Sequence, residues 1–271
     1  MIITNILKGI GKRWSKKNGL NKQHQLGWLA EKILKHKDDQ LPKQHQFPKF
    51  VLNYIRPYEV IKTYKEIFGT EIYKFSTQKK NPIILDCGAN IGISTLYFAL
   101  NYPTSNIYAF EPDKTIFDLL NKNINDNKLT NIVAYNDAIW TEDCTLSFSN
   151  KGSEASQIDM SGISSTKVNA IKFSNFLLRH EQIDFVKMDI EGAEFEVIMD
   201  CANQLHKIEN LFLEYHGTCD ETHKLKTLLD IVKNAGFKVY IKMAADNLAM
   251  PFMEKNTGTP FDVQLNIFCY K

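Results

Sequence analysis

From Asn81 onward the chain alternates short apolar segments with longer amphipathic ones, and this alternation restricts the fold more than any other feature. Short apolar runs separated by stretches of helical length are typical of repeated strand–helix units around a mostly parallel sheet. We therefore expect an α/β domain with a seven-stranded sheet and helices on both faces. The expected strands are residues 83–86, 106–110, 132–135, 183–188, 211–215, 237–241 and 263–270, and the expected helices are 92–101, 113–127, 192–201 and 221–235.

Residues 1–80 lack this alternation, and we expect them to form a basic N-terminal helical cap ahead of a main domain at 81–271. Residues 1–50 carry a net charge of +8, whereas the rest of the chain carries −6. Within residues 1–17, apolar side chains recur at helical spacing beside basic ones. This stretch either packs on the main domain or lies on an anionic membrane surface. The polar stretch 141–167 is predicted to be an insertion, either a small hairpin beside a site or a mobile loop.

The composition excludes several classes of protein. With 44% hydrophobic and 24% charged residues, the chain is neither wholly disordered nor collagen-like. Its five cysteines lack the spacing of a structural zinc site or a disulfide scaffold, which favours a reducing, cytoplasmic location. No apolar run reaches the length of a membrane span, and we expect no secretory signal.

The first expected strand ends in a turn, Asp86-Cys-Gly-Ala-Asn-Ile-Gly92, that leads directly into a helix. A dinucleotide-binding loop would have glycines at positions 88, 90 and 93, but this chain has Asn90 and Ile93. A diphosphate needs free amides without a carboxylate beside them, so Asp86 favours a positively charged ligand that has no phosphate. S-adenosylmethionine fits this description. The predicted contacts in this loop are Asp86, Gly88, Ala89, Asn90 and Gly92.

Two further positions favour a ligand that contains adenosine. Glu111 follows the second strand, where a carboxylate accepts hydrogen bonds from both ribose hydroxyls. This position does not separate S-adenosylmethionine from NAD. After the third strand, Asp137 and Ala138 are predicted to contact the adenine, although a turn cap explains Asp137 equally well.

The fourth and fifth strands end in ionisable residues. Lys187 and Asp189 end a buried strand, where polar groups cost free energy unless they are paired or functional, and Asp189 is also expected to contact the cofactor. Glu214 and His216 are two residues apart in the next strand and so point to one face. If these strands are neighbours, Asp189, Glu214 and His216 meet at one edge. That group is then a general base, an acceptor-binding pair, a divalent-cation site, or a carboxylate–histidine pair that only braces the sheet.

Taken together, the motifs resemble the FkbM family of S-adenosylmethionine-dependent methyltransferases. The first motif and Phe110-Glu111-Pro112 are typical of class I methyltransferases in general. The segment Lys187-Met-Asp-Ile-Glu-Gly-Ala-Glu194, followed by Leu213-Glu214-Tyr-His216, narrows the resemblance to this family. It covers residues 81–217 and implies a Rossmann-like class I fold and O-methylation of a hydroxyl on a sugar, glycan or secondary metabolite. Residues 1–80 carry none of it.

For the reaction we predict His216 as the first candidate general base and Asp189 as the second, with Glu214 and Lys187 completing the catalytic set. Three other functions stay open from the sequence. An NAD-dependent oxidoreductase is disfavoured by the absent third glycine, and a nucleic-acid methyltransferase by the clustered acids. The third is a non-catalytic cofactor-binding domain that its basic arm recruits to a membrane or partner. The acceptor, the need for a metal and the oligomeric state are not predicted.

Overall fold

The computed structural model describes residues 31, 41–149, 157–158, 166–248, 250–253 and 260–271. It divides the chain into two compact units, residues 1–74 and 75–271, close to the predicted boundary at 80 and 81. The amphipathic stretch within residues 1–17 lies outside the described residues, so its two interpretations stay predictions. None of the helices in the described part has the length and apolar character needed to cross a membrane.

The described part of the first unit contains a small sheet and a helix. Strand β1 (Lys43–Gln46) pairs antiparallel with β2 (Val51–Tyr54). Helix α3 (Pro57–Tyr64) continues into the π-helical turn η2 (Lys65–Gly69). Stacked or tilted aromatic rings form the core of this unit, namely Phe47, Phe50, Tyr64 and Phe68.

The prediction of helices throughout residues 21–80 is therefore wrong for residues 43–54. β1 is polar along its whole length, so its sequence has none of the apolar alternation that marks a strand. Its conformation depends on pairing with β2 and on a turn in which the amide of Phe47 donates to the carbonyl of Phe50 (2.8 Å). Such pairing is tertiary information that local sequence patterns do not contain.

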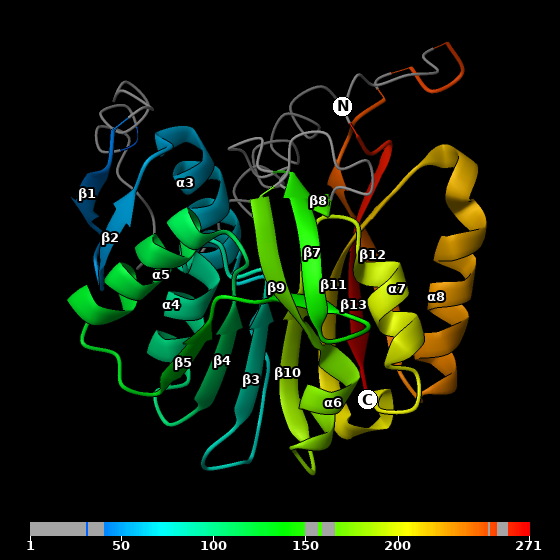
Figure 1. Cartoon of the computed structure of the whole chain (residues 1–271), viewed down its shortest axis with the longest axis horizontal. Helices are drawn as coiled ribbons and strands as arrows, with labels where there is room; N and C mark the ends of the chain where they lie inside the picture. Colours follow the sequence, from blue (N-terminus) through cyan, green and yellow to red (C-terminus); the bar gives the residue numbers. More distant parts are fainter. Residues whose placement is uncertain (1–30, 32–40, 150–156, 159–165, 249, 254–259) are drawn as a thin grey trace, which may run out of the picture. The chain divides into compact units, whose positions relative to one another are not determined.

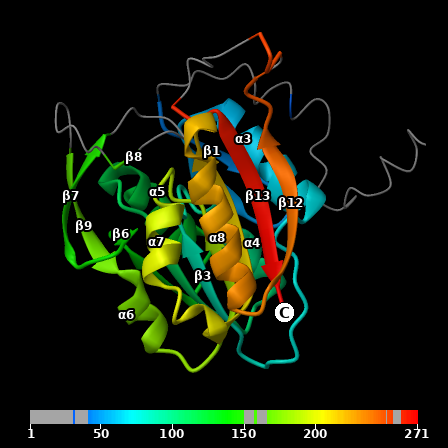
Figure 2. The same ribbon diagram turned by 90° about the vertical axis from the view of Figure 1, so that its right-hand side faces the viewer.

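The second unit is built on a seven-stranded sheet with the order β12-β13-β11-β10-β3-β4-β5 (Figure 1). β13 runs antiparallel to the other six strands of this sheet, and Figure 2 shows it beside β12. All seven predicted strands are confirmed, in the arrangement of a class I methyltransferase. Their bounds are β3 (Ile83–Cys87), β4 (Asn106–Phe110), β5 (Ile132–Tyr135), β10 (Ile183–Met188), β11 (Ile208–Gly217), β12 (Lys238–Ala245) and β13 (Val263–Tyr270).

Helices cover both faces of this sheet, as predicted. On one face α6 (Phe173–Leu178), α7 (Glu194–Asp200) and α8 (Thr222–Asn234) share one apolar core with the strands, and α7 and α8 lie side by side (Figure 2). On the opposite face, α4 (Ile93–Asn101) packs on β3 and β4. Helix α5 (Lys114–Asp126) packs there through Leu120 and Ile124 against Ala109 of β4. The short 3-10 turns η3 (Leu205–Lys207) and η4 (Cys219–Glu221) flank β11.

The predicted insertion contributes to a separate four-stranded sheet with the order β6-β9-β7-β8. It consists of β6 (Ala138–Trp140), β7 (Cys144–Ser149), β8 (Gln157–Ile158) and β9 (Thr166–Lys172). Strand β9 pairs antiparallel with β7 and parallel with β6. The described parts of the insertion therefore have the strand pairing of the hairpin alternative, with residues 150–156 and 159–165 outside the described part of the chain.

Candidate active site

The strand register brings three loop regions to one edge of the large sheet. Lys187 of β10 lies opposite Asp86 of β3 on one side and opposite Phe212 of β11 on the other, and all three strands are parallel. Their carboxyl ends therefore meet at the same edge. From β3 the chain adds β4 and β5 on one side and later β10 and β11 on the other, so the order in which strands are added switches sides between β3 and β10. Open α/β sheets bind their ligands at such a switch point.

The loop after β3 uses all of its own amide donors. Every backbone N–H from Gly88 to Gly92 donates a hydrogen bond within the chain. Gly88 and Ala89 donate to the Phe110 carbonyl, Asn90 to Glu111 Oε2, Ile91 to Asn90 Oδ1, and Gly92 to the Ala89 carbonyl, at 2.7–3.0 Å. A diphosphate binds such a loop through free amides. This loop therefore has no amide donor to offer a dinucleotide.

Gly88 joins this loop directly to the turn after β10. Its φ of 76° lies in the left-handed region, and a Cβ at this position would lie 1.8 Å from the backbone oxygen of Asp189. The amide of Asp189 in turn donates to the carbonyl of Cys87 (3.2 Å). Only glycine satisfies both requirements, so Asp189 is held against the cofactor loop by backbone packing.

Glu111 lies beside the same loop with 8% of its surface exposed. One carboxylate oxygen accepts from the amide of Asn90 and the other from the amide of Asp113, each at 2.9 Å. Burial raises the pKa of Glu111 to about 7, against these two hydrogen bonds, which lower it. Each oxygen keeps a second lone pair, which suits two neighbouring ribose hydroxyls.

The predicted adenine contacts lie close to Glu111 in the chain. Asn136 donates through its side-chain amide to the carbonyl oxygens of Glu111 and Pro112 at 2.9 and 3.0 Å. This places the adjacent Asp137 near Glu111, half-buried and with its pKa raised by burial. Ala138 begins β6 and packs in a small apolar cluster.

Asp86 and Lys187 lie beneath the loop. Asp86 is fully buried and accepts hydrogen bonds from the hydroxyls of Ser94 and Thr95 at 2.7 and 2.6 Å. The Lys187 ammonium lies 3.8 Å from Asp86 and 3.2 Å from Asp189, and it donates to the carbonyl of Gly88 at 2.6 Å. Burial lowers the pKa of Lys187, but the two carboxylates outweigh it and raise the pKa above its ordinary value. Asp86 and Lys187 thus brace the loop from below, and the ligand contact of Asp86 and the catalytic role of Lys187 stay predictions.

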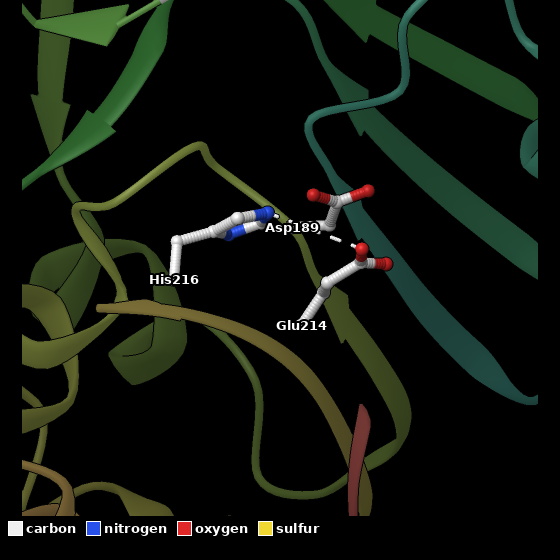
Figure 3. A group of neighbouring side chains, drawn as sticks. All are labelled: Asp189, Glu214 and His216. Atoms are coloured by element: carbon white, nitrogen blue, oxygen red, sulfur yellow. Dashed lines mark ion pairs between the residues drawn. The ribbon is translucent and has the colours of Figure 1, made fainter. Parts of the chain in front are cut away.

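Asp189, Glu214 and His216 converge at the sheet edge (Figure 3). One possible ligand atom from each lies within 4.8 Å of the other two, and His216 Nε2 is 3.9 Å from Glu214 Oε1. The side chains of Asp189 and Glu214 are 26% and 24% exposed, whereas that of His216 is 2% exposed. The carboxylates are therefore accessible, and the imidazole forms the floor beneath them.

Sequence reasoning missed two neighbours of this group. Glu194 is fully buried; its carboxylate accepts from the amides of Ile190 (3.0 Å) and Gly192 (3.1 Å) and lies 3.3 Å from His216 Nδ1. Glu191 has a left-handed φ of 55°, and its carboxylate lies 3.6 Å from His216 Nε2. The signal in the sequence that could have revealed these two neighbours was the Glu191-Gly192 pair, because a glycine turn within the motif folds both acids back toward the end of the strand.

These carboxylates set the protonation of the group. Burial lowers the pKa of His216, but Glu194, Glu191 and Asp189 outweigh it and raise the pKa to about 10. Burial and then Asp189 raise the pKa of Glu191 to about 9. The edge therefore holds more carboxylates than its cations neutralise. A buried ring that faces carboxylates through both nitrogens is also poorly placed to take a proton from an acceptor.

The comparisons with known proteins agree with this geometry. A family model described as the Methyltransferase FkbM domain matches residues 86–239, more than half of the chain. The chain belongs to the FkbM methyltransferase family. The match extends from the cofactor loop through the Lys187–Glu194 motif to β12, so the resemblance inferred from the motifs is confirmed. This FkbM protein is a methyltransferase, and the oxidoreductase alternative is wrong.

Individual relatives are more distant. The FkbM protein is 25% identical over 210 residues to Methyltransferase 1 of Beauveria bassiana, covering 68% of its own chain and 83% of that relative. It is 29% identical over 171 residues to Methyltransferase sdnD of Sordaria araneosa, covering 50% of its own chain and 66% of that one. Among solved structures, it is similar to Methyltransferase FkbM from Methylobacillus flagellatus, with 15% identity and a TM-score of 0.48 over 72% of this chain and 45% of that one.

Proposed function

We propose that this FkbM methyltransferase transfers a methyl group from S-adenosylmethionine to a hydroxyl of a sugar, glycan or secondary metabolite. The observation that carries the proposal is the pairing of two features at one edge. A loop without free amides lies directly against Asp189, the first of three acidic side chains at this edge, Asp189, Glu191 and Glu214, that are each about one quarter exposed.

The residues of the first feature fit the methyl donor. S-adenosylmethionine supplies a sulfonium methyl group, whose C–S bond breaks as the C–O bond of the product forms and the thioether leaves. It has no phosphate, in keeping with amides that are all used inside the loop. Glu111 is placed to accept hydrogen bonds from its ribose hydroxyls, and the carboxylates of the edge favour its positive charge.

The second feature suits a neutral, hydroxylated acceptor. An ionised carboxylate accepts hydrogen bonds and donates none, so a row of carboxylates selects for molecules rich in O–H donors. The same charges repel a nucleic-acid backbone. One relative, 26% identical and matched over 12% of its own length, is named AMB antimetabolite synthetase AmbE of Pseudomonas aeruginosa. A small-metabolite acceptor is in keeping with that name.

The acceptor's proton passes to a carboxylate of the edge. Asp189 and Glu191 are each about one quarter exposed, and Asp189 is the one held against the cofactor loop. His216 is nearly inaccessible beneath them, so an acceptor hydroxyl reaches the carboxylates first. Alignment of donor and acceptor contributes more to the rate than the base, about 7 to 11 kcal/mol against 10²- to 10⁴-fold in rate.

Transfer of a labelled methyl group tests the proposal. The protein is incubated with methyl-labelled S-adenosylmethionine and fractions of hydroxylated metabolites and glycans, and the labelled product is identified. We expect an ether whose formation falls at least 10²-fold in Asp189→Asn, with the affinity for S-adenosylhomocysteine retained. The matched control is Asp220→Asn, the same change at an exposed position in η4. Binding of the donor with no labelled hydroxyl product would refute the proposal and favour the non-catalytic alternative.

A further inference from the structure

The geometry of Asp189, Glu214 and His216 differs from that of a hydrogen-bonded group. The dashed line in Figure 3 joins His216 Nε2 and Glu214 Oε1, which are 3.9 Å apart and so beyond hydrogen-bond range. The three ligand atoms nevertheless lie within 4.8 Å of one another. Atoms that each lie about 2.1 Å from one ion are separated by roughly 3 to 4 Å, so small side-chain rotations bring these three to coordinating distance.

The orientation of the imidazole is a second, independent observation. Glu194 is fully buried and lies 3.3 Å from Nδ1 of His216, and a carboxylate there favours the proton on Nδ1. Nε2 then points into the group from a side chain that is 2% exposed, and a bound cation would take the place of the proton on this nitrogen. Within the described residues no group lies within hydrogen-bond distance of Nε2, since its nearest carboxylate oxygens are at 3.6 and 3.9 Å. A carboxylate that orients a histidine from behind is the arrangement found around metal-ligating imidazoles.

We propose that Asp189, Glu214 and His216 bind a divalent cation and that this cation holds the acceptor's hydroxyl oxygen. The proposal rests on the proposed function, because it names how that function's acceptor is bound. One imidazole nitrogen and two carboxylates suit Mn²⁺ or Zn²⁺ better than Ca²⁺, which takes six to eight oxygen ligands. Three protein ligands leave positions open on the accessible side, where Asp189 and Glu214 are exposed.

The charges of the edge support this assignment. Lys187 already neutralises part of Asp86 and Asp189 from below, and it is buried there. A cation among Asp189, Glu214 and His216 would compensate the negative charge that this edge still carries. It would also polarise the acceptor's O–H bond. The acceptor's proton passes to the carboxylate oxygen of Asp189 that does not bind the cation, and the methyl C–S bond breaks as the new C–O bond forms.

Binding of Mn²⁺ alone tests the site on the full-length protein after treatment with a chelator. We expect one Mn²⁺ per chain, measured by the loss of the free-ion paramagnetic resonance signal. Glu214→Gln should weaken binding at least tenfold, because it replaces a charged ligand by a neutral one. Glu196→Gln, on the neighbouring helix and outside the group, is the matched control and should bind as the wild type does. Thermal unfolding and affinity for S-adenosylhomocysteine verify that both variants are folded.

The outcomes separate this inference from the proposed function. Mn²⁺ binding that Glu214→Gln does not weaken, or no Mn²⁺ binding by the wild type, overturns the cation site. Methyl transfer that persists undiminished after chelation also overturns it and leaves the proposed function intact. A bound Mn²⁺ that Glu214→Gln removes, with no hydroxyl methylated, supports the site and refutes the proposed function.

Discussion

Glu111 should make the affinity for the nucleoside part of the donor depend on pH. Its pKa is raised to about 7 mainly by burial. The ionised carboxylate offers acceptors to both ribose hydroxyls, whereas the protonated form loses one of them. The ionised fraction falls roughly tenfold between pH 8 and pH 6, so the dissociation constant should rise about tenfold, or about 1.4 kcal/mol.

The assay is titration calorimetry with 5′-methylthioadenosine, which keeps the ribose and lacks the amino acid groups that titrate near this range. Glu111→Gln is expected to bind more weakly and to show no such slope between pH 6 and 8. A wild-type affinity that is flat over this range, or a variant with the same slope as the wild type, would refute the reasoning.

The raised pKa of Glu111 affects the stability of the ligand-free protein in the opposite direction, lowering it as the pH rises. Because the folded pKa of Glu111 lies above its ordinary value of 4.5, the folded state binds the proton more tightly than the unfolded state. Its contribution to the free energy of unfolding is full below pH 4.5 and is lost as the pH rises through 7, by about 3 kcal/mol in all. The difference between wild type and Glu111→Gln in denaturant unfolding at pH 5 and pH 8 measures this loss, and a difference independent of pH contradicts it.

Three further substitutions test the packing of the site. Gly88→Ala places a Cβ against the backbone oxygen of Asp189 at a left-handed φ. We expect the free energy of unfolding, measured with denaturant, to fall by about 3 kcal/mol or more, and an unchanged midpoint contradicts this. Lys187→Met leaves the buried Asp86 and the partly exposed Asp189 without their cation and should cost about 3 to 5 kcal/mol in the same assay. Gly192→Ala would bring a Cβ within 2.8 Å of the Phe261 ring. Phe261→Leu should recover part of that loss, and strict additivity in the double variant would show that the ring is not responsible.

The sheet could be predicted from the sequence because buried parallel strands have a strong signal. Ile183–Met188 is buried at every position, so the apolar run in the sequence has no other plausible location than the centre of a sheet. Once β10 and β11 are taken as neighbours, the meeting of Asp189 with Glu214 and His216 follows from strand direction alone. This part of the candidate site needed no knowledge of side-chain conformation.

Other parts depend on tertiary contacts that no local pattern contains. The hydrogen bonds that bury Asp86 come from the hydroxyls of Ser94 and Thr95 in the first turn of α4, and no local pattern announces them. The contacts of Glu191 and Glu194 with His216 are set by a turn with left-handed residues, whereas their place just before an expected helix is also typical of ordinary first-turn acids. In the same way, the short helix α6 and strand β6 went unpredicted, because they are too brief to show a period.

The antiparallel strand β13 has a consequence for how such a protein diversifies. It lies between β11 and β12 and begins at the edge that carries His216, with Gln264 opposite that histidine. The connection formed by residues 246–262 therefore starts and finishes at that edge, and its Phe261 ring lies 5.0 Å from the His216 ring. We therefore expect substitutions along this connection to alter the choice of acceptor more than the binding of the donor, whose loop lies on the far side of β10. Selectivity and methyl supply would then be encoded in separate stretches of the chain.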